Sequence, residues 1–138
     1  MRKPLLILFL ALLVIGCKES LEERAERDAR VFTERNCPTP VVNNSRTDSV
    51  AFDKVTKTYT YYCSLVGEYD NEEFIDTFKN DLDKQLVESI SDDTSITKLK
   101  EAGFNFKFII RSDSNPEKTL YEKIITAEEY NNPLVRIL

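Results

Sequence analysis

The sequence has 138 residues, which is enough for one domain with a modest hydrophobic core. It carries 24 acidic and 19 basic residues, for a formal net charge of −5, and an acidic chain without a basic run argues against nucleic-acid binding. The sequence also lacks histidine, which removes the usual general base at neutral pH and the commonest metal ligand. Ser-His and Cys-His nucleophiles are therefore excluded, and we expect no cofactor.

Residues 1–16 have the layout of a secretory signal peptide. A basic start, Met1-Arg2-Lys3, precedes 11 consecutive apolar residues from Leu5 to Ile15. A transmembrane helix needs about 20 apolar residues, so this run is too short to span a bilayer and is typical of a cleaved signal. Its removal would leave 17 basic and 24 acidic residues and a net charge of −7.

The signal ends in Val14-Ile15-Gly16-Cys17, which resembles the lipobox of bacterial lipoproteins. The resemblance implies that diacylglycerol is attached to the Cys17 sulfur and that the chain is cut between Gly16 and Cys17. The new amino terminus is usually acylated as well, and two or three acyl chains, palmitate among them, give a firm membrane anchor. A plain signal peptide with an incidental cysteine is the alternative.

The anchor places the protein in the cell envelope. Lys18, rather than Asp, follows the cysteine, which fits transport to an outer membrane, on its periplasmic or its surface face. The expected partners are therefore the membrane, through the lipid, and a protein of the envelope.

Two cysteines, Cys37 and Cys63, are left once Cys17 is lipidated. The compartment beyond the inner membrane permits disulfides, and an even count allows a Cys37–Cys63 bond. Such a bond would close a loop of about 25 residues and stabilise the fold by roughly 3 kcal/mol. Two separate thiols are the alternative, with Cys63 as a small apolar core residue.

The first half of the mature chain predicts a tether over residues 17–20, a helix, a linker and a hairpin. Ser20 and Glu23 fit a capping box at the start of an amphipathic helix over residues 21–35. Residues 38–46 are rich in turn formers and predict an extended linker. Residues 48–54 and 56–66 then predict a β-hairpin, with Tyr59, Tyr61, Cys63 and Leu65 facing inward.

The second half predicts two helices, a second hairpin and a last turn. Asp70 and Glu73 suggest a cap for a long amphipathic helix over residues 71–90, and a shorter helix over 94–101 ends at Gly103. Residues 104–111 alternate as a strand, and residues 119–126 form the next strand after the turn at 113–118. Thr126 and Glu129 then suggest a cap for the last turn. That turn begins like a calcium loop, but Lys118 and Ile124 replace its required Gly and Glu, so we expect no metal site.

These elements follow in the order α-β-β-α-α-β-β. Since every pair of neighbouring strands can form a hairpin, we predict a four-stranded antiparallel sheet with the helices on one face, which is a two-layer α+β fold. A single domain over residues 21–132 and a C-terminal tail over 133–138 follow from this arrangement.

Residues 45–66, SRTDSVAFDKVTKTYTYYCSLV, resemble a family of small uncharacterised bacterial secreted proteins and lipoproteins. The family pattern is T-R-x-D-S-V followed by a strand of Y-x-Y-T-L-V type, and the matching residues are Arg46, Asp48, Ser49, Val50, Tyr61, Leu65 and Val66. Ser45 and Cys63 depart from it. The resemblance implies a leading helix, a linker, a helix between strand pairs and an envelope location, but no activity.

Two surfaces could recognise a partner. Arg46 and Asp48 lie where the linker meets the first strand, and they either pin the linker to the sheet or form a recognition patch. Lys107 and Arg111, with Tyr62, make a second surface on the outer face of the sheet, and its alternative role is simply the solvated side.

We therefore expect a lipid-anchored envelope protein that is not an enzyme and that binds or supports a protein partner. One hypothesis is a binding module that uses the open sheet face or a strand edge. The other is an inhibitor or immunity-type protein acting on an envelope enzyme or toxin. An exposed apolar patch would favour the first, and a dense acidic patch would favour the second.

Overall fold

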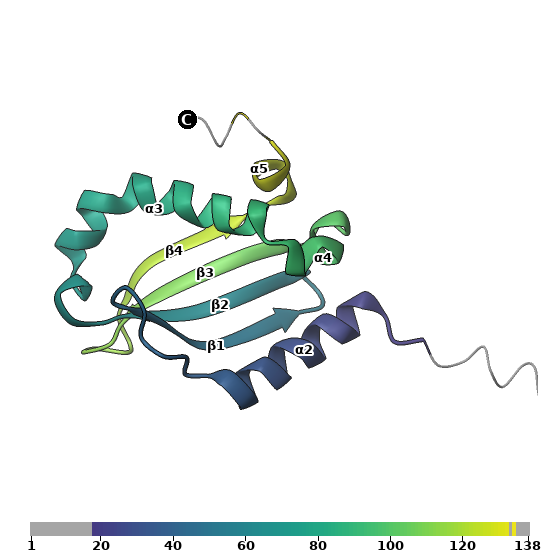
Figure 1. Cartoon of the computed structure of the whole chain (residues 1–138), viewed down its shortest axis with the longest axis horizontal. Coiled ribbons are helices and arrows are strands. Elements are labelled where there is room, and N and C mark those ends of the chain that lie inside the picture. The colour runs from purple at the N-terminus through teal and green to yellow at the C-terminus, as the bar shows by residue number, and fades with distance from the viewer. Residues whose placement is uncertain (1–17, 133, 135–138) are drawn as a thin grey trace, which may run out of the picture.

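The computed structural model describes residues 18–132 and residue 134. The predicted signal peptide, the lipobox with Gly16 and Cys17, and most of the predicted C-terminal tail lie outside these residues. The elements, in chain order (Figure 1), are α2 Leu21–Asn36, β1 Ser45–Asp53, β2 Thr58–Leu65, α3 Glu72–Asp92, α4 Thr97–Glu101, β3 Asn105–Ser112, β4 Thr119–Ile125 and α5 Ala127–Asn131. Short 3₁₀ turns at Gly67–Tyr69 and Thr94–Ile96 precede α3 and α4.

The four strands form one mixed sheet in the order β1-β2-β3-β4. β1 and β2 are antiparallel, as are β3 and β4, and these two hairpins were predicted correctly. The prediction of a wholly antiparallel sheet is wrong, because β2 and β3 run parallel from Thr58↔Asn105 to Leu65↔Ser112.

The parallel pair follows from the length of α3. A helix of 21 residues is about 31 Å long, so it carries the chain back along the whole sheet before β3 begins. Parallel neighbours need such a crossover, whereas a hairpin needs only a tight turn. Gly103, at φ +74°, then turns the chain from α4 into β3 at the end where β2 also starts.

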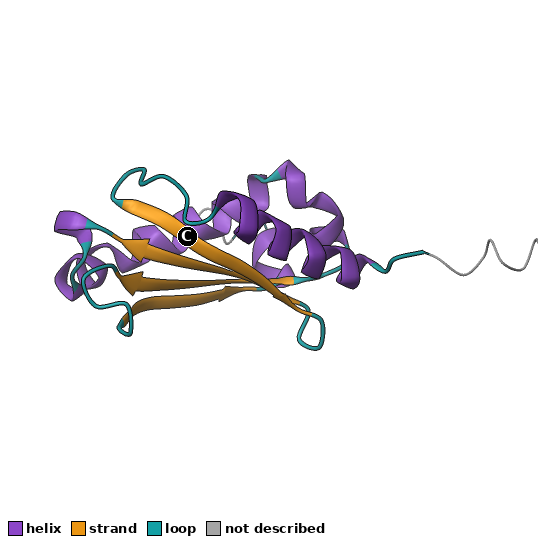
Figure 2. Ribbon diagram, turned by 90° about the horizontal axis from the view of Figure 1, so that it is seen from below, coloured by secondary structure: helices purple, strands orange, loops and turns teal. Residues whose placement is uncertain are grey.

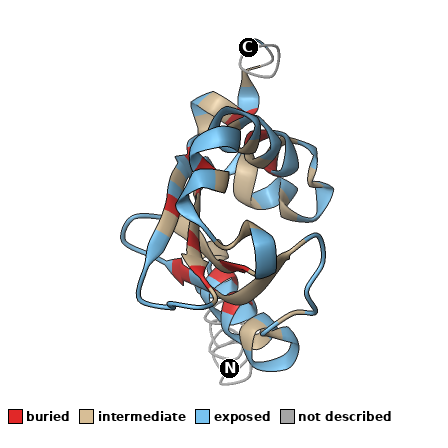
Figure 3. Cartoon of the chain, turned by 90° about the vertical axis from the view of Figure 1, so that its left-hand side faces the viewer, coloured by how far each residue is buried: buried red, intermediate tan, exposed pale blue. Residues whose placement is uncertain are grey.

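The helices lie on one side of the sheet, which leaves the other face open (Figure 2). α2 packs against β1, and α3 packs against β4. Buried residues concentrate between the two layers (Figure 3), and the most completely buried large side chains are Phe104, Phe106 and Ile125. Two-layer α+β architecture with one helical face is thus the observed fold.

The helix caps test the sequence prediction residue by residue. The reciprocal capping boxes Ser20–Glu23 of α2 and Thr126–Glu129 of α5 are both present. The cap of α3 was assigned one residue too early, since the Asn71 side chain accepts the hydrogen bond from Phe74 N at 2.7 Å.

Side-chain hydrogen bonds join α4 to the end of α3 and join α5 to the residue just before β3. Lys100 Nζ donates to the carbonyl oxygens of Ile90 at 2.9 Å and Ser91 at 2.8 Å. These carbonyls belong to the last turn of α3, where the helix itself supplies no donor for them. The Tyr130 hydroxyl of α5 donates to the carbonyl oxygen of Phe104 at 2.9 Å. Across the described part of the chain, no helix has the length and apolar character needed to cross a bilayer.

The outer edge of β1 is occupied by segments of the chain itself. Thr33 Oγ1 of α2 bonds both the N–H and the C=O of Val50, each at 2.9 Å. Thr39 of the linker donates its N–H to Thr47 O, and its hydroxyl accepts from Thr47 N, both at 2.9 Å. These bonds take up edge groups that a partner strand would need, so they oppose strand addition at β1.

Candidate functional site

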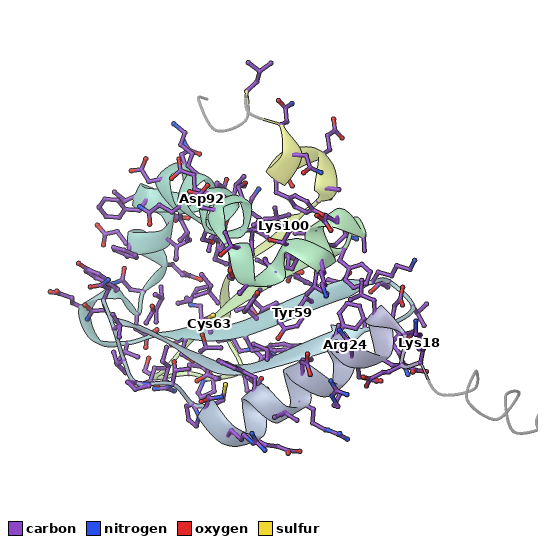
Figure 4. The ribbon with its side chains drawn as sticks, turned by 45° about the vertical axis from the view of Figure 1, so that its right-hand side comes forward. Lys18, Arg24, Tyr59, Cys63, Asp92 and Lys100 are labelled. Atoms are coloured by element: carbon purple, nitrogen blue, oxygen red, sulfur yellow. The ribbon has the colours of Figure 1, made fainter. Side chains whose placement is uncertain are left out.

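A trough runs along the helix-bearing face of the sheet. α2 covers the β1 side and α3 covers the β4 side, so the strip over β2 lies between two helical walls. Figure 4 shows Tyr59 and Cys63 along this strip, with Arg24 of α2 on one side and Lys100 on the other. Its floor consists of the inward residues of β2 that the alternation predicted, together with Phe108 of β3.

The first hollow of the trough has a volume of about 710 Å³. Its floor is Val50, Tyr59 and Tyr61, and its walls come from α2 on one side and from residues 93–101 on the other. The apolar wall residues are Leu21, Ala25, Phe32, Ile96 and Leu99. A volume in this range is typical of ligand pockets in proteins.

The second hollow follows the first along β2 and has a volume of about 750 Å³. Its floor is Thr47, Cys63, Phe108 and Ile110, between the linker on one side and α3 on the other. The apolar wall residues are Pro40, Val42, Phe74, Leu82 and Leu86. The rings of Tyr61 and Phe108 stack at 4.7 Å, so the floors of the two hollows meet.

The tyrosine hydroxyls in the trough floor are neutral and form no hydrogen bonds with the described residues. Burial, followed by the influence of Asp28, raises the pKa of Tyr59 to about 12, and burial also raises the pKa of Tyr61. No hydrogen bond to either hydroxyl is formed by the described residues. The floor therefore presents aromatic surface with donors available to an occupant.

Of the two alternatives left open for Cys37 and Cys63, the structure supports separate thiols and not a disulfide. Both cysteines are free, and Cys63 Sγ instead lies 4.0 Å from Thr47 Oγ1. Cys63 belongs to the floor of the second hollow, whereas Cys37 follows α2 at the helix end. Burial raises the pKa of Cys63 to about 11 and also raises that of Cys37, which disfavours the thiolate needed for nucleophilic attack.

The predicted recognition patch lies on the open face, where its residues pair with neighbouring side chains, and Arg46 also lines the second hollow. Arg46 bonds Asp48 and Asp113, each at 2.7 Å, and these carboxylates raise its pKa, Asp48 more strongly. The Ser64 hydroxyl donates to the other oxygen of Asp48. Asp48 stands at a register shift between Thr47 and Ser49, where a bulge turns its side chain toward Arg46.

The second predicted surface is also internally paired. The Arg111 guanidinium lies 5.1 Å from the centre of the Tyr62 ring, and Lys107 bonds Glu122 of β4 at 2.7 Å. The register places Arg46 and Arg111 on either side of Ser64, so the structure does bring the two surfaces together. Their role in recognition stays a prediction.

Metal ligands do not gather in the described residues: no group of three Cys, Asp or Glu side chains could hold an ion there. The Asp113 carboxylate of the rejected calcium loop bonds Arg46.

Sequence reasoning found the floor of the trough but missed the trough itself. The alternation placed Tyr59, Tyr61 and Cys63 inward, and the structure confirms that they face the helices. The pattern could not show that α2 and α3 pack on opposite margins of the sheet. The structure leaves apolar wall residues such as Phe32 and Val42 exposed, which the sequence alone does not reveal.

Three solved structures share this fold. A Pseudomonas aeruginosa protein (PA3611) described as secreted has a TM-score of 0.63 and 10% identity, covering 82% of this chain and 99% of its own. EpsS, the pilotin of the Vibrio vulnificus type 2 secretion system, has a TM-score of 0.59 and 14% identity over 80% and 91% of the two chains. AspS, the type II secretion system pilotin of Vibrio cholerae, has a TM-score of 0.57 and 14% identity over 79% and 91%.

At these identities the likeness establishes a common fold. None of the curated proteins matches the sequence. The sequence itself matches a family over residues 20–121, which include α2, the whole trough floor and most of the sheet. The chain therefore belongs to the family described as "Domain of unknown function (DUF8479)".

Proposed function

We propose that this chain is a lipid-anchored protein of the bacterial cell envelope, and that it binds an apolar segment of a partner protein in the trough. The observation that carries the proposal is the aromatic floor of Tyr59, Tyr61 and Phe108, which the domain's own helices leave partly exposed. Two type II secretion pilotins and a protein described as secreted share this fold, which supports the setting.

Lipidation of Cys17 would hold the protein at the membrane, and Lys18 favours the outer membrane. Labelled palmitate in growing cells tests this part of the proposal. Wild-type protein should take up label and Cys17→Ala should not. Equal labelling of the two would rule out Cys17 as the attachment site.

The occupant of the trough should be an amphipathic helix. β2 and β3 are the central strands of the sheet, so their backbone groups are already paired on both sides. An occupant obtains no backbone hydrogen bonds from this floor and must satisfy its own, as a helix does. From Tyr59 to Leu65 the floor is roughly 20 Å long, which matches a helix of about 13 residues.

The proposed role is binding rather than catalysis. Histidine is absent from the sequence, and the raised pKa of Cys63 keeps the thiol in the floor protonated. Several carboxylates in α2 and just before it are paired with cations, including Glu19 with Arg27 and Glu26 with Lys54. These pairs weaken the case for an acidic surface of the kind that an inhibitor of a basic protein would use.

Photo-crosslinking from two adjacent tyrosines tests the proposal. A photoreactive phenylalanine analogue replaces Tyr61, in the trough, or Tyr62, on the open face of the same strand. In intact envelopes, position 61 should yield an adduct with one protein, and the crosslinked peptide should have an amphipathic helical pattern. Position 62 is the matched control and should yield little of that adduct.

The result separates the two faces of the sheet. An adduct that forms from position 62 and not from position 61 would move the binding site to the Arg46 and Arg111 surface. Equal yields from both positions would contradict a specific site in the trough.

A further inference from the structure

The segment that precedes α2 is tied to the helix. The Glu19 carboxylate accepts two hydrogen bonds from Arg27, at 2.6 and 2.7 Å, and Ser20 forms the reciprocal cap with Glu23. In the sequence, Lys18 alone separates Glu19 from Cys17. Since two residues span at most about 7 Å, a lipid on Cys17 would attach almost directly to the start of α2.

The β1–β2 turn, residues 54–57, lies beside this start of α2 (Figure 1). Lys54 Nζ is 2.9 Å from a Glu26 carboxylate oxygen, and Lys57 Nζ is 3.8 Å from one of Glu22. Both glutamates belong to the first turns of α2, and Figure 4 shows Lys18 at the same end of the helix. The turn and the start of α2 therefore lie together at one end of the domain.

Val55 projects from the tip of this turn. Its exposed fraction is 92%, the highest among the large apolar side chains of the described residues. The turn is held in shape by Asp53, whose carboxylate accepts hydrogen bonds from Val55 N at 2.8 Å and Thr56 N at 3.3 Å. A single exposed valine is ordinary on a protein surface, but this one stands on a hydrogen-bonded turn beside the start of α2, which follows the proposed lipid site in the sequence.

The charges around Val55 suit a lipid surface. Unpaired, the carboxylates of Glu22 and Glu26 would repel anionic headgroups. Lys54 and Lys57 pair with these carboxylates, and their long aliphatic stems flank the valine in the sequence. Lysines next to an apolar residue can keep their ammonium groups in water while their stems lie in the interface.

We propose that the β1–β2 turn is a second membrane contact, with Val55 inserted into the interfacial layer of the bilayer that holds Cys17. This inference rests on the lipidation of Cys17 in the proposed function. In this orientation the strands point away from the membrane, with the Thr58 end of β2 at the membrane and the Leu65 end distant from it. The first hollow then opens next to the headgroups and the second lies farther out.

A fluorescent probe at two turns tests this orientation. The mature chain, residues 17–138 with Cys37→Ala and Cys63→Ala, is coupled through Cys17 to a maleimide-bearing lipid. The vesicles contain phosphatidylethanolamine and phosphatidylglycerol. A polarity-sensitive fluorescent amino acid replaces either Val55 or Asn115 in the β3–β4 turn. Asn115 is the matched control, because it is an exposed turn residue at the opposite end of the same sheet.

Coupling should shift the emission of the probe at position 55 to shorter wavelength, and lipids with brominated acyl chains should quench it. The probe at position 115 should show neither change. An unchanged spectrum at position 55 would overturn the proposal, as would equal responses at both positions. Because the anchor is supplied chemically, failure of Cys17 lipidation in cells cannot produce either of these results.

Discussion

The two faces of the sheet satisfy their side chains in different ways. On the open face, the charged groups of the predicted patch pair with one another: Arg46 with two carboxylates, Lys107 with Glu122, and Arg111 with the Tyr62 ring. On the helix-bearing face, the apolar floor of the trough extends beyond what α2 and α3 cover. The contrast indicates that unsatisfied surface, which a partner can use, gathers in the trough rather than on the polar face.

The largest expected effect on stability comes from a comparison of two phenylalanines of β3, one in the core and one in the floor of the trough. Phe106 is completely buried and packs edge-on against Tyr130 at 5.8 Å. Its replacement by Ala should lower the free energy of unfolding by about 3–5 kcal/mol, as deletion of a core aromatic ring does. Phe108 faces the same way two residues later but is partly exposed in the second hollow, so Phe108→Ala should cost only about 1–2 kcal/mol.

Denaturant unfolding of the two variants measures this difference. An unchanged slope of the transition would show that each variant still unfolds as one unit. Equal losses for Phe106→Ala and Phe108→Ala would mean that the trough floor is packed as tightly as the core. A tightly packed floor would leave no apolar surface for the proposed partner helix to cover.

A smaller effect is expected on the open face. Arg46→Met leaves Asp48 and Asp113 without their cation and should lower the free energy of unfolding by about 1 kcal/mol, since all three groups are partly exposed to solvent. Added salt should shrink this difference because it screens the pairs. Lys107→Met, which removes one exposed pair, is the matched control and should cost less than about 0.5 kcal/mol.

Arg46→Met also tests recognition by this surface. If the variant keeps wild-type stability and loses an adduct that forms from position 62 rather than from position 61, the Arg46 surface would be the binding site. The proposal for the trough expects loss of about 1 kcal/mol of stability with the adduct from position 61 retained.

Local signals predicted much of this fold because they act over a few residues. The capping boxes at Ser20 and Thr126 and the alternation in β2 and β3 each depend on neighbours in sequence, and all are present. The parallel pairing of β2 and β3 depends on where α3 ends in space. Local hairpin signals at the two neighbouring pairs could not reveal it.

The prediction of the cap residue of α3 was wrong for a related reason. Asp70 and Asn71 are both good capping residues, and the sequence motif favoured Asp70 through Glu73. The folded chain brings Ser114 of the β3–β4 turn to Asp70, and its N–H donates to the carboxylate at 2.8 Å. A long-range contact thus engages Asp70 and leaves the cap to Asn71.

The smallest expected effect concerns this carboxylate and its dependence on pH. Burial alone would raise the pKa of Asp70, but hydrogen bonds from Ser112 and Ser114 outweigh it and lower the pKa. A carboxyl whose pKa is lower in the folded state stabilises the fold above its unfolded pKa of about 3.9, and the contribution disappears as the pH falls through the folded value. Asp70→Asn keeps an acceptor for Ser114 N, so its cost at pH 7 should be about 0.5 kcal/mol or less.

Urea unfolding of wild type and Asp70→Asn across pH 2–7 shows whether this linkage exists. The two stabilities should differ most at neutral pH and begin to converge near pH 4, where the carboxyl of the unfolded chain becomes protonated. They should meet once the pH has fallen through the lower pKa of the folded state. A gap that stays constant down to pH 2 would instead assign the loss to packing of the amide. Because Asp70 joins the start of α3 to the β3–β4 turn, convergence would also show that this link between the helical layer and the sheet is electrostatic, unlike the apolar contacts that line the trough.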